Sequence, residues 1–151
     1  GGAIFSRCSG LIIDNCSFIN NKAPGNSSSD TDGFCGAVYI YGANSQILNS
    51  KFEGNRARCA GAVRFVYAGI VDNCSFINNK AITPETVSSP SVYGGALYIS
   101  ASNVKVLNSK FEGNNATVYG GAISIYAKGK NNFVIENIRN FNVLKIIKII
   151  Q

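Results

Sequence analysis

Residues 14–23 read Asp-Asn-Cys-Ser-Phe-Ile-Asn-Asn-Lys-Ala, and the same ten residues recur unchanged at 72–81. A second block, residues 48–55 with the sequence Leu-Asn-Ser-Lys-Phe-Glu-Gly-Asn, recurs at 107–114. The two blocks repeat at offsets of 58 and 59 residues. Two different segments copied at nearly one offset indicate an array of repeats, in which each unit stacks on the next. This repetition therefore decides the fold.

Each repeat unit has two halves. The first half is a small-residue turn followed by a strand of alternating residues, at residues 1–6, 35–40, 60–65, 94–99 and 120–125. The second half is an apolar strand, a polar corner, a Phe and an Asn, as in Ile13, Asn15, Phe18 and Asn21. The alanines of successive turns are spaced by 34, 25, 34 and 26 residues. The longer spacings contain inserts at residues 24–34 and 82–93, whose Ser, Pro, Thr and Gly content indicates surface loops.

The predicted strands are short and β-branched, with Gly and Asn at the corners and no helical period. A unit of this size cannot bury its own apolar face, but it can do so between two neighbouring units. Strands at matching places then lie parallel, ~4.8 Å apart. The sequence therefore predicts an all-β parallel β-helix of about five coils over residues 1–127, with residues 128–151 as a degenerate last coil or a C-terminal cap. The alternative, a leucine-rich horseshoe, needs a dense Leu-x-x-Leu-x-Leu frame that this chain lacks.

Matching positions of successive units become columns along the stack. Two columns are expected to face inward: Ile4, Val38, Val63, Leu97 and Ile123, and Ser6, Ile40, Phe65, Ile99 and Ile125. An internal aromatic stack is expected from Phe18, Phe52, Phe76 and Phe111. Asn tolerates left-handed backbone, and its amide can bond the amide of the next coil. Two corner ladders are therefore expected, from Asn15, Asn49, Asn73 and Asn108, and from Asn21, Asn55, Asn79 and Asn114.

The pairing of Gly-Gly-Ala-Ile with Phe-x-x-Asn, once in each coil, resembles the repeat of chlamydial polymorphic outer membrane proteins. It is equally similar to adhesin-like surface proteins of methanogenic archaea and other microbes. The resemblance covers residues 1 to about 127, and Cys35 and Ala60 depart from it by replacing the first Gly. It implies a right-handed parallel β-helix, exported to the cell surface or secreted, with an adhesive or structural role. It supplies no catalytic or binding residues.

The composition of the chain limits the kinds of catalysis and binding that we expect of it. The chain has 151 residues, a net charge of +6 and no His, so it lacks the commonest general base and metal ligand at neutral pH. The basic residues of the last 24 positions are scattered among Ile, Val and Phe without a nucleic-acid-reading motif, and we expect no nucleic-acid binding. No segment has the length of an apolar transmembrane helix. We expect no metal and no cofactor.

Aromatic and arginine side chains mark the candidate ligand-contact surface. Strand alternation directs one column outward, namely Phe5, Tyr39, Arg64, Tyr98 and Ser124. The next outward column is Arg7, Tyr41, Val66, Ser100 and Tyr126. A flat face with Tyr and Arg suits a sugar or protein partner, because these residues are enriched at binding hot spots. The alternative is that cross-strand aromatic stacking only stabilises the sheet. The candidates are Tyr39, Tyr41, Arg64, Tyr98 and Tyr126.

Carboxylates and thiols give weaker signals. Asp14 and Asp72 share a column, with Leu48 between them. Their expected backbone separation of two coils is near the distance between the two catalytic carboxyl groups of inverting glycosidases. Both residues, however, lie inside the copied block. Their recurrence therefore follows from duplication alone. Cys16 and Cys74 are expected to be small buried side chains. Cys35 and Cys59 precede the turns of adjacent coils, and the sequence leaves open whether they form a disulfide.

These observations predict a fragment of a non-enzymatic surface protein of the adhesin type. Its rod would display loops and a flat face to a host or cell-surface glycan or protein. The inserts at residues 24–34 and 82–93 are two coils apart, and we expect them to form a recognition edge on one side. Two alternatives stay open: a polysaccharide lyase or hydrolase on the same scaffold, and a structural spacer without a ligand.

Overall fold

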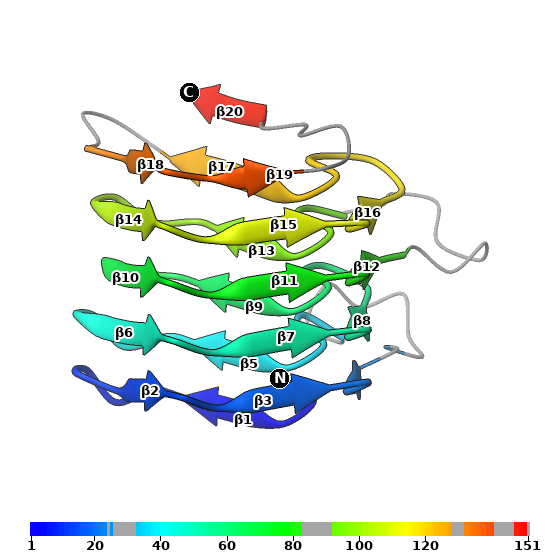
Figure 1. Cartoon of the computed structure of the whole chain (residues 1–151), viewed down its shortest axis with the longest axis horizontal. Helices are drawn as coiled ribbons and strands as arrows, with labels where there is room; N and C mark the ends of the chain where they lie inside the picture. Colours follow the sequence, from blue (N-terminus) through cyan, green and yellow to red (C-terminus); the bar gives the residue numbers. More distant parts are fainter. Residues whose placement is uncertain (24, 26–32, 83–91, 128–131, 141–146, 151) are drawn as a thin grey trace.

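The computed structural model describes residues 1–23, 25, 33–82, 92–127, 132–140 and 147–150. These residues form a stack of coils, and the first four coils pass through the same four sheets in the same order (Figure 1). The chain rises from β1 in the first coil to β20 at the opposite end of the stack (Figure 1). This arrangement confirms the all-β parallel β-helix of about five coils.

Each of the first four coils contains four strands. The first has β1 (Ile4–Ser6), β2 (Ile12–Asp14), β3 (Ser17–Ile19) and β4 (Lys22–Ala23). The second has β5 (Val38–Ile40), β6 (Ser45–Leu48), β7 (Lys51–Glu53) and β8 (Arg56–Ala57). The third has β9 (Val63–Phe65), β10 (Gly69–Asp72), β11 (Ser75–Ile77) and β12 (Lys80–Ala81). The fourth has β13 (Leu97–Ile99), β14 (Val104–Leu107), β15 (Lys110–Glu112) and β16 (Asn115–Ala116).

The last part of the chain continues these sheets. It contributes β17 (Ile123–Ala127), β18 (Val134–Glu136), β19 (Arg139–Asn140) and β20 (Ile147–Ile150). The strand orders are β1-β5-β9-β13-β17-β20, β18-β14-β10-β6-β2, β19-β15-β11-β7-β3 and β16-β12-β8-β4. Every pairing is parallel and joins equivalent repeat positions, as Val38 with Val63 and Phe52 with Phe76. Residues 23 to 35 positions apart in sequence therefore become direct neighbours.

The predicted inward columns form the core. The side chains of Val38, Val63, Leu97 and Ile123 are fully buried. The Phe18, Phe52, Phe76 and Phe111 rings stack with centroids 4.9, 4.9 and 4.8 Å apart and nearly parallel planes. Such aromatic pairs contribute about 0.5–1.5 kcal/mol each beyond the area that they bury. The aromatic stack thus joins the interiors of the first four coils by direct ring contacts.

The Asn21 column forms a ladder inside the stack. Asn55 Nδ2 donates to the Phe18 carbonyl at 2.9 Å and to Asn79 Oδ1 at 2.9 Å. Asn55 Oδ1 accepts from the backbone N–H of Asn21 at 3.0 Å and from its Nδ2 at 2.9 Å. Asn79 repeats this pattern one coil further on, toward Asn114. Both Asn55 and Asn79 are fully buried, and every polar atom of their side chains is satisfied.

The Asn15 column forms a second ladder, which is exposed. Asn73 Nδ2 donates to Asn49 Oδ1 at 2.8 Å, and Asn49 Nδ2 donates to Asp14 Oδ1 at 2.8 Å. The backbone is left-handed throughout this column, with φ of 51° at Asn15, 49° at Asn49 and 51° at Asn73. None of the four Asn residues of the buried ladder has positive φ. The sequence predicted both ladders correctly, but only the exposed one depends on the tolerance of Asn for left-handed backbone.

Cys16 is exposed rather than buried, because it belongs to the first coil and no described coil covers it, whereas Cys74 in the copied block is buried.

The predicted recognition loops at 24–34 and 82–93 lie mostly outside the described residues. Within the part of the chain that the structure describes, no helix is long and apolar enough to cross a membrane.

We predict that the buried ladder is a main determinant of stability. Asn55→Ala leaves the Asn21 N–H without its acceptor and removes the bonds to Phe18 and Asn79, which should lower the free energy of unfolding by about 3 kcal/mol. Asn21→Ala removes only the half-buried end of the ladder and should cost about 1 kcal/mol. Urea denaturation of both variants measures the difference, and equal costs would contradict the assignment.

Candidate functional site

An arginine lies among three aromatic rings on the outer face of the six-stranded sheet. Arg64 on β9 pairs in register with Tyr39 on β5 and with Tyr98 on β13. Its guanidinium carbon is 5.2 Å from the centre of the Tyr39 ring, 5.0 Å from that of Tyr98 and 4.7 Å from that of Phe34. Cation–π contacts of this kind hold the guanidinium in place. Arg64 Nε is buried and has no hydrogen-bond partner among the described residues.

Tyr98 differs from its predicted exposure. Its side chain points away from the core, as strand alternation predicts, yet it is only 6% exposed. The Tyr93 ring covers it at 4.7 Å and stacks on Tyr119 at 5.5 Å. Burial raises the pKa of the Tyr98 hydroxyl well above its usual range, and the Arg64 charge opposes that shift. Ser124, the next residue of the column, is also fully buried. Tyr98 belongs to a second apolar cluster on this outer face, together with Cys35, Cys59 and Ala60.

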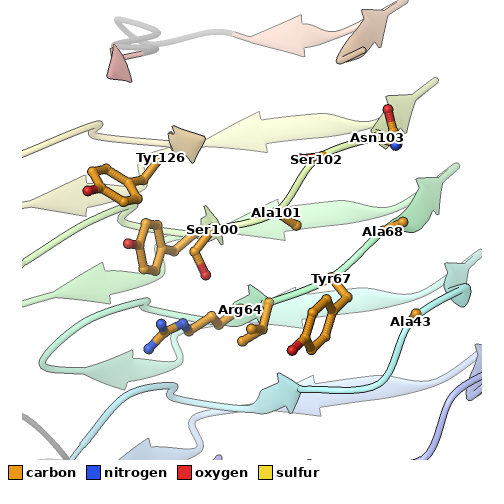
Figure 2. A pocket seen from close by; sticks show the side chains of 11 residues that line it. Ala43, Arg64, Tyr67, Ala68, Ser100, Ala101, Ser102, Asn103 and Tyr126 are labelled. Atoms are coloured by element: carbon orange, nitrogen blue, oxygen red, sulfur yellow. The ribbon is translucent and has the colours of Figure 1, made fainter. Parts of the chain in front are cut away.

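A groove of about 590 Å³ opens beside this cluster and crosses several coils (Figure 2). Tyr67 projects from the third coil and Tyr126 from the fifth, and the fourth coil places Ser100, Ala101 and Ser102 between them (Figure 2). Because these side chains are small, they leave a hollow between Tyr67 and Tyr126. We call it the tyrosine groove; its lining is Ala43, Arg64, Val66, Tyr67, Ala68, Tyr98, Ser100, Ala101, Ser102, Asn103 and Tyr126.

The tyrosine groove offers stacking surfaces and hydrogen-bond donors. Tyr67 is 47% exposed and meets Tyr41 edge-on, with ring centres 5.4 Å apart. A hydrogen bond with Tyr41 raises the pKa of the Tyr67 hydroxyl. None of the described lining residues is acidic, while Arg64 carries a positive charge. The arrangement suits a ligand that presents a flat apolar face and accepts hydrogen bonds, such as a sugar ring.

The five predicted contact residues all lie on this sheet face, but they have different surroundings. Arg64, Tyr98 and Tyr126 line the tyrosine groove, Tyr41 flanks it through Tyr67, and Tyr39 is half-buried below Arg64. Sequence reasoning missed Tyr67, which lies beyond the alternating strand β9 at a corner where the repeat units differ. The available signal was its aromatic character directly before the small residues Ala68 and Gly69.

Two buried cysteines, Cys35 and Cys59, belong to the same apolar cluster as Tyr98. Cys35 is level with Ala60 of the next coil rather than with Cys59, and both thiols are free. Burial raises the pKa of the Cys35 thiol, and the nearby Cys59 adds to that effect. Burial also raises the pKa of Cys59 to about 11, although Arg64 and Arg58 oppose it. Cys35 and Cys59 are therefore free thiols in this structure and do not form the disulfide that the sequence left open.

The candidate catalytic carboxylates are structural partners of the exposed ladder. Asp14 and Asp72 lie two coils apart, with Leu48 in register between them. Asp14 Oδ1 accepts from Asn49 Nδ2 at 2.8 Å, and Asp72 Oδ1 accepts from Asn108 Nδ2 at 2.8 Å. Both carboxylates therefore hold corner amides in position. Among the described residues, no three His, Cys, Asp or Glu side chains gather where they could hold a metal ion.

Parallel coils in register around an aromatic core define a β-helical repeat protein. The model of one family, described as the right handed beta helix region, matches residues 1–144. The chain therefore belongs to the right-handed β-helix family, in agreement with the handedness that the resemblance of its repeats implies. No curated protein and no solved structure matches it.

We predict two classes of thiol in the folded protein. At pH 8, iodoacetamide should modify the exposed Cys8 and Cys16 rapidly. Cys35, Cys59 and Cys74 should react only on unfolding, because burial excludes the reagent and raises the pKa of Cys59 and Cys74 to about 11. Peptide mass spectrometry with and without urea checks this. Rapid labelling of Cys35 or Cys59 in the native protein would contradict this prediction, because it would show that the apolar cluster around Tyr98 opens in solution.

Proposed function

We propose that this chain is part of a non-enzymatic, exported adhesin-like protein that binds a cell-surface glycan or protein in the tyrosine groove. The β-helix is a rigid scaffold, and its outer face presents the ligand-contact residues. The observation that carries the proposal is the groove itself. It combines an exposed Tyr67, a fixed Arg64 and small polar side chains on one face of the sheet.

The chemistry of the groove supports recognition of a ligand. Its volume of about 590 Å³ falls in the range of small-ligand pockets. Tyrosine and arginine contribute disproportionately to binding energy because they offer a rigid surface and directed donors. Arg64 also lines the tyrosine groove, so its positive charge suits a ligand that presents hydrogen-bond acceptors.

The surroundings of the acidic residues favour binding over turnover. Retaining and inverting glycosidases both need two carboxyl groups that flank one bond. Asp14 and Asp72 are instead engaged by ladder amides and separated by Leu48, and neither lines the tyrosine groove. The resemblance to polymorphic outer membrane proteins and microbial adhesin-like proteins supports placement at the cell surface or outside the cell.

We predict that Tyr67→Ala weakens ligand binding about 10-fold, because one aromatic stacking contact is worth about 1.4 kcal/mol. Ser102→Trp should abolish binding by filling the hollow, while the fold persists because Ser102 lies on its open wall. Tyr119→Ala is the matched control, since it removes a partly exposed tyrosine outside the groove. Glycan and host-protein arrays identify the ligand, and titration of that ligand measures each variant.

Three outcomes separate the candidate functions. A signal that Tyr67→Ala weakens and Tyr119→Ala leaves unchanged supports the adhesin. An absence of signal on broad glycan and protein arrays would favour a structural spacer. Turnover of a glycan that is lost in Asp14→Asn or Asp72→Asn would favour an enzyme.

A further inference from the structure

Three basic side chains form a column on a different face of the molecule. Lys22 on β4 is paired in register with Arg56 on β8, which is paired with Lys80 on β12. Parallel neighbours of this kind lie ~4.8 Å apart and point to the same side. All three side chains are exposed, whereas the following residues, Ala23, Ala57 and Ala81, turn inward. We call Lys22, Arg56 and Lys80 the cation column.

Within the described part of the chain, no ion pair compensates the charges of the cation column. Among the described residues, no carboxylate lies within salt-bridge distance of Lys22, Arg56 or Lys80. Like charges directly opposite each other on neighbouring strands are destabilising. In the adjacent sheet, by contrast, Lys51 pairs with Glu53 and Lys110 pairs with Glu112, both at 2.6 Å. An external anion would remove the repulsion along the cation column.

The cation column borders a hollow of about 690 Å³. Its other lining residues are Asn20, Asn78, Asn115, Gly54, Gly113 and Glu53. A Cβ at Gly54 would lie 2.3 Å from Asn20 Oδ1, and one at Gly113 would lie 2.1 Å from Asn78 Oδ1. The two glycines therefore make room for the amides of Asn20 and Asn78 beside the cations. The acid among these residues, Glu53, already has its charge paired with Lys51.

We infer that the cation column and its hollow bind a linear anionic polysaccharide that runs along the stack. The evenly spaced cations meet carboxylate or sulfate groups on successive sugars, and the Asn amides hydrogen-bond sugar hydroxyls. This site is separate from the tyrosine groove and does not depend on it, because the two share no lining residue.

The surroundings favour a polysaccharide over a nucleic acid. Proteins that bind single strands combine a basic groove with aromatic side chains on which the bases stack. The hollow beside the cation column has no aromatic residue among those that line it. Amides and glycines instead provide hydrogen bonds and close approach, which suit hydroxyl-rich chains.

The test uses heparin and polygalacturonate as sulfated and carboxylated probes, with dextran and a single-stranded oligonucleotide for comparison. The triple variant Lys22→Gln, Arg56→Gln and Lys80→Gln should weaken binding of at least one anionic polysaccharide about 10-fold or more. It should also flatten the dependence of affinity on salt concentration. The control triple variant Arg7→Gln, Lys105→Gln and Arg139→Gln removes the same charge from exposed sites outside the sheet that carries the cation column, and should change affinity less than about 2-fold.

A variant that extends the cation column tests directly whether polysaccharide binding depends on the alignment of the cations. Asn115 on β16 occupies the next position after Lys80, so Asn115→Lys lengthens the cation column by one coil. It should tighten polysaccharide binding and steepen the salt dependence. Gln46→Lys adds the same charge on β6, in another sheet, and should have a smaller effect.

Several results would overturn the inference. These are no binding of either anionic polysaccharide, equal losses in the two triple variants, or tighter binding of the oligonucleotide than of the polysaccharides. Tyr67→Ala should leave polysaccharide binding at the cation column unchanged. Failure of this site and failure of the tyrosine groove are therefore distinguishable.

Discussion

The buried amide ladder through Asn55 and Asn79 sets the register on which the other features depend. Each amide must face the equivalent amide of the coils before and after it, and a shift of one residue would leave four buried polar atoms without partners. The Phe stack is compatible with this register but tolerates small displacements, because ring contacts are weakly directional. Hydrogen bonding thus provides the specificity of the stack, and apolar burial provides most of its driving force.

Because the coils stack in a fixed register, outward residues at the same repeat position form a column along the stack. The same geometry that stacks Phe52 on Phe76 inside places Lys22, Arg56 and Lys80 in line outside. The tyrosine groove arises in the opposite way, since the fourth coil has small residues where its neighbours have Tyr67 and Tyr126. Repetition therefore builds a linear charged surface, and departures from repetition build a local hollow. The two surfaces suit different ligands for this reason.

The sequence predicted the interior well because copied residues have copied environments, as the Phe stack and both Asn ladders show. It failed where burial depends on neighbours outside the repeat. Strand alternation gives the direction of Tyr98 but not the Tyr93 ring that covers it. The identical blocks around Cys16 and Cys74 differ in burial because only one lies between coils. Tyr67 and the cation column were missed because the aligned residues are not identical, and a column of Lys, Arg, Lys and Asn leaves no clear repeat signal.

The central claim is that coils stack in register around the Phe column. Nuclear Overhauser spectroscopy on protein labelled at Phe tests it most directly, with single Phe→Leu variants to assign the four rings. The account predicts ring-to-ring contacts between Phe18 and Phe52, between Phe52 and Phe76, and between Phe76 and Phe111. It predicts none between Phe18 and Phe76, which are two coils apart. A contact between those two rings, or the loss of any of the three predicted contacts, would contradict it.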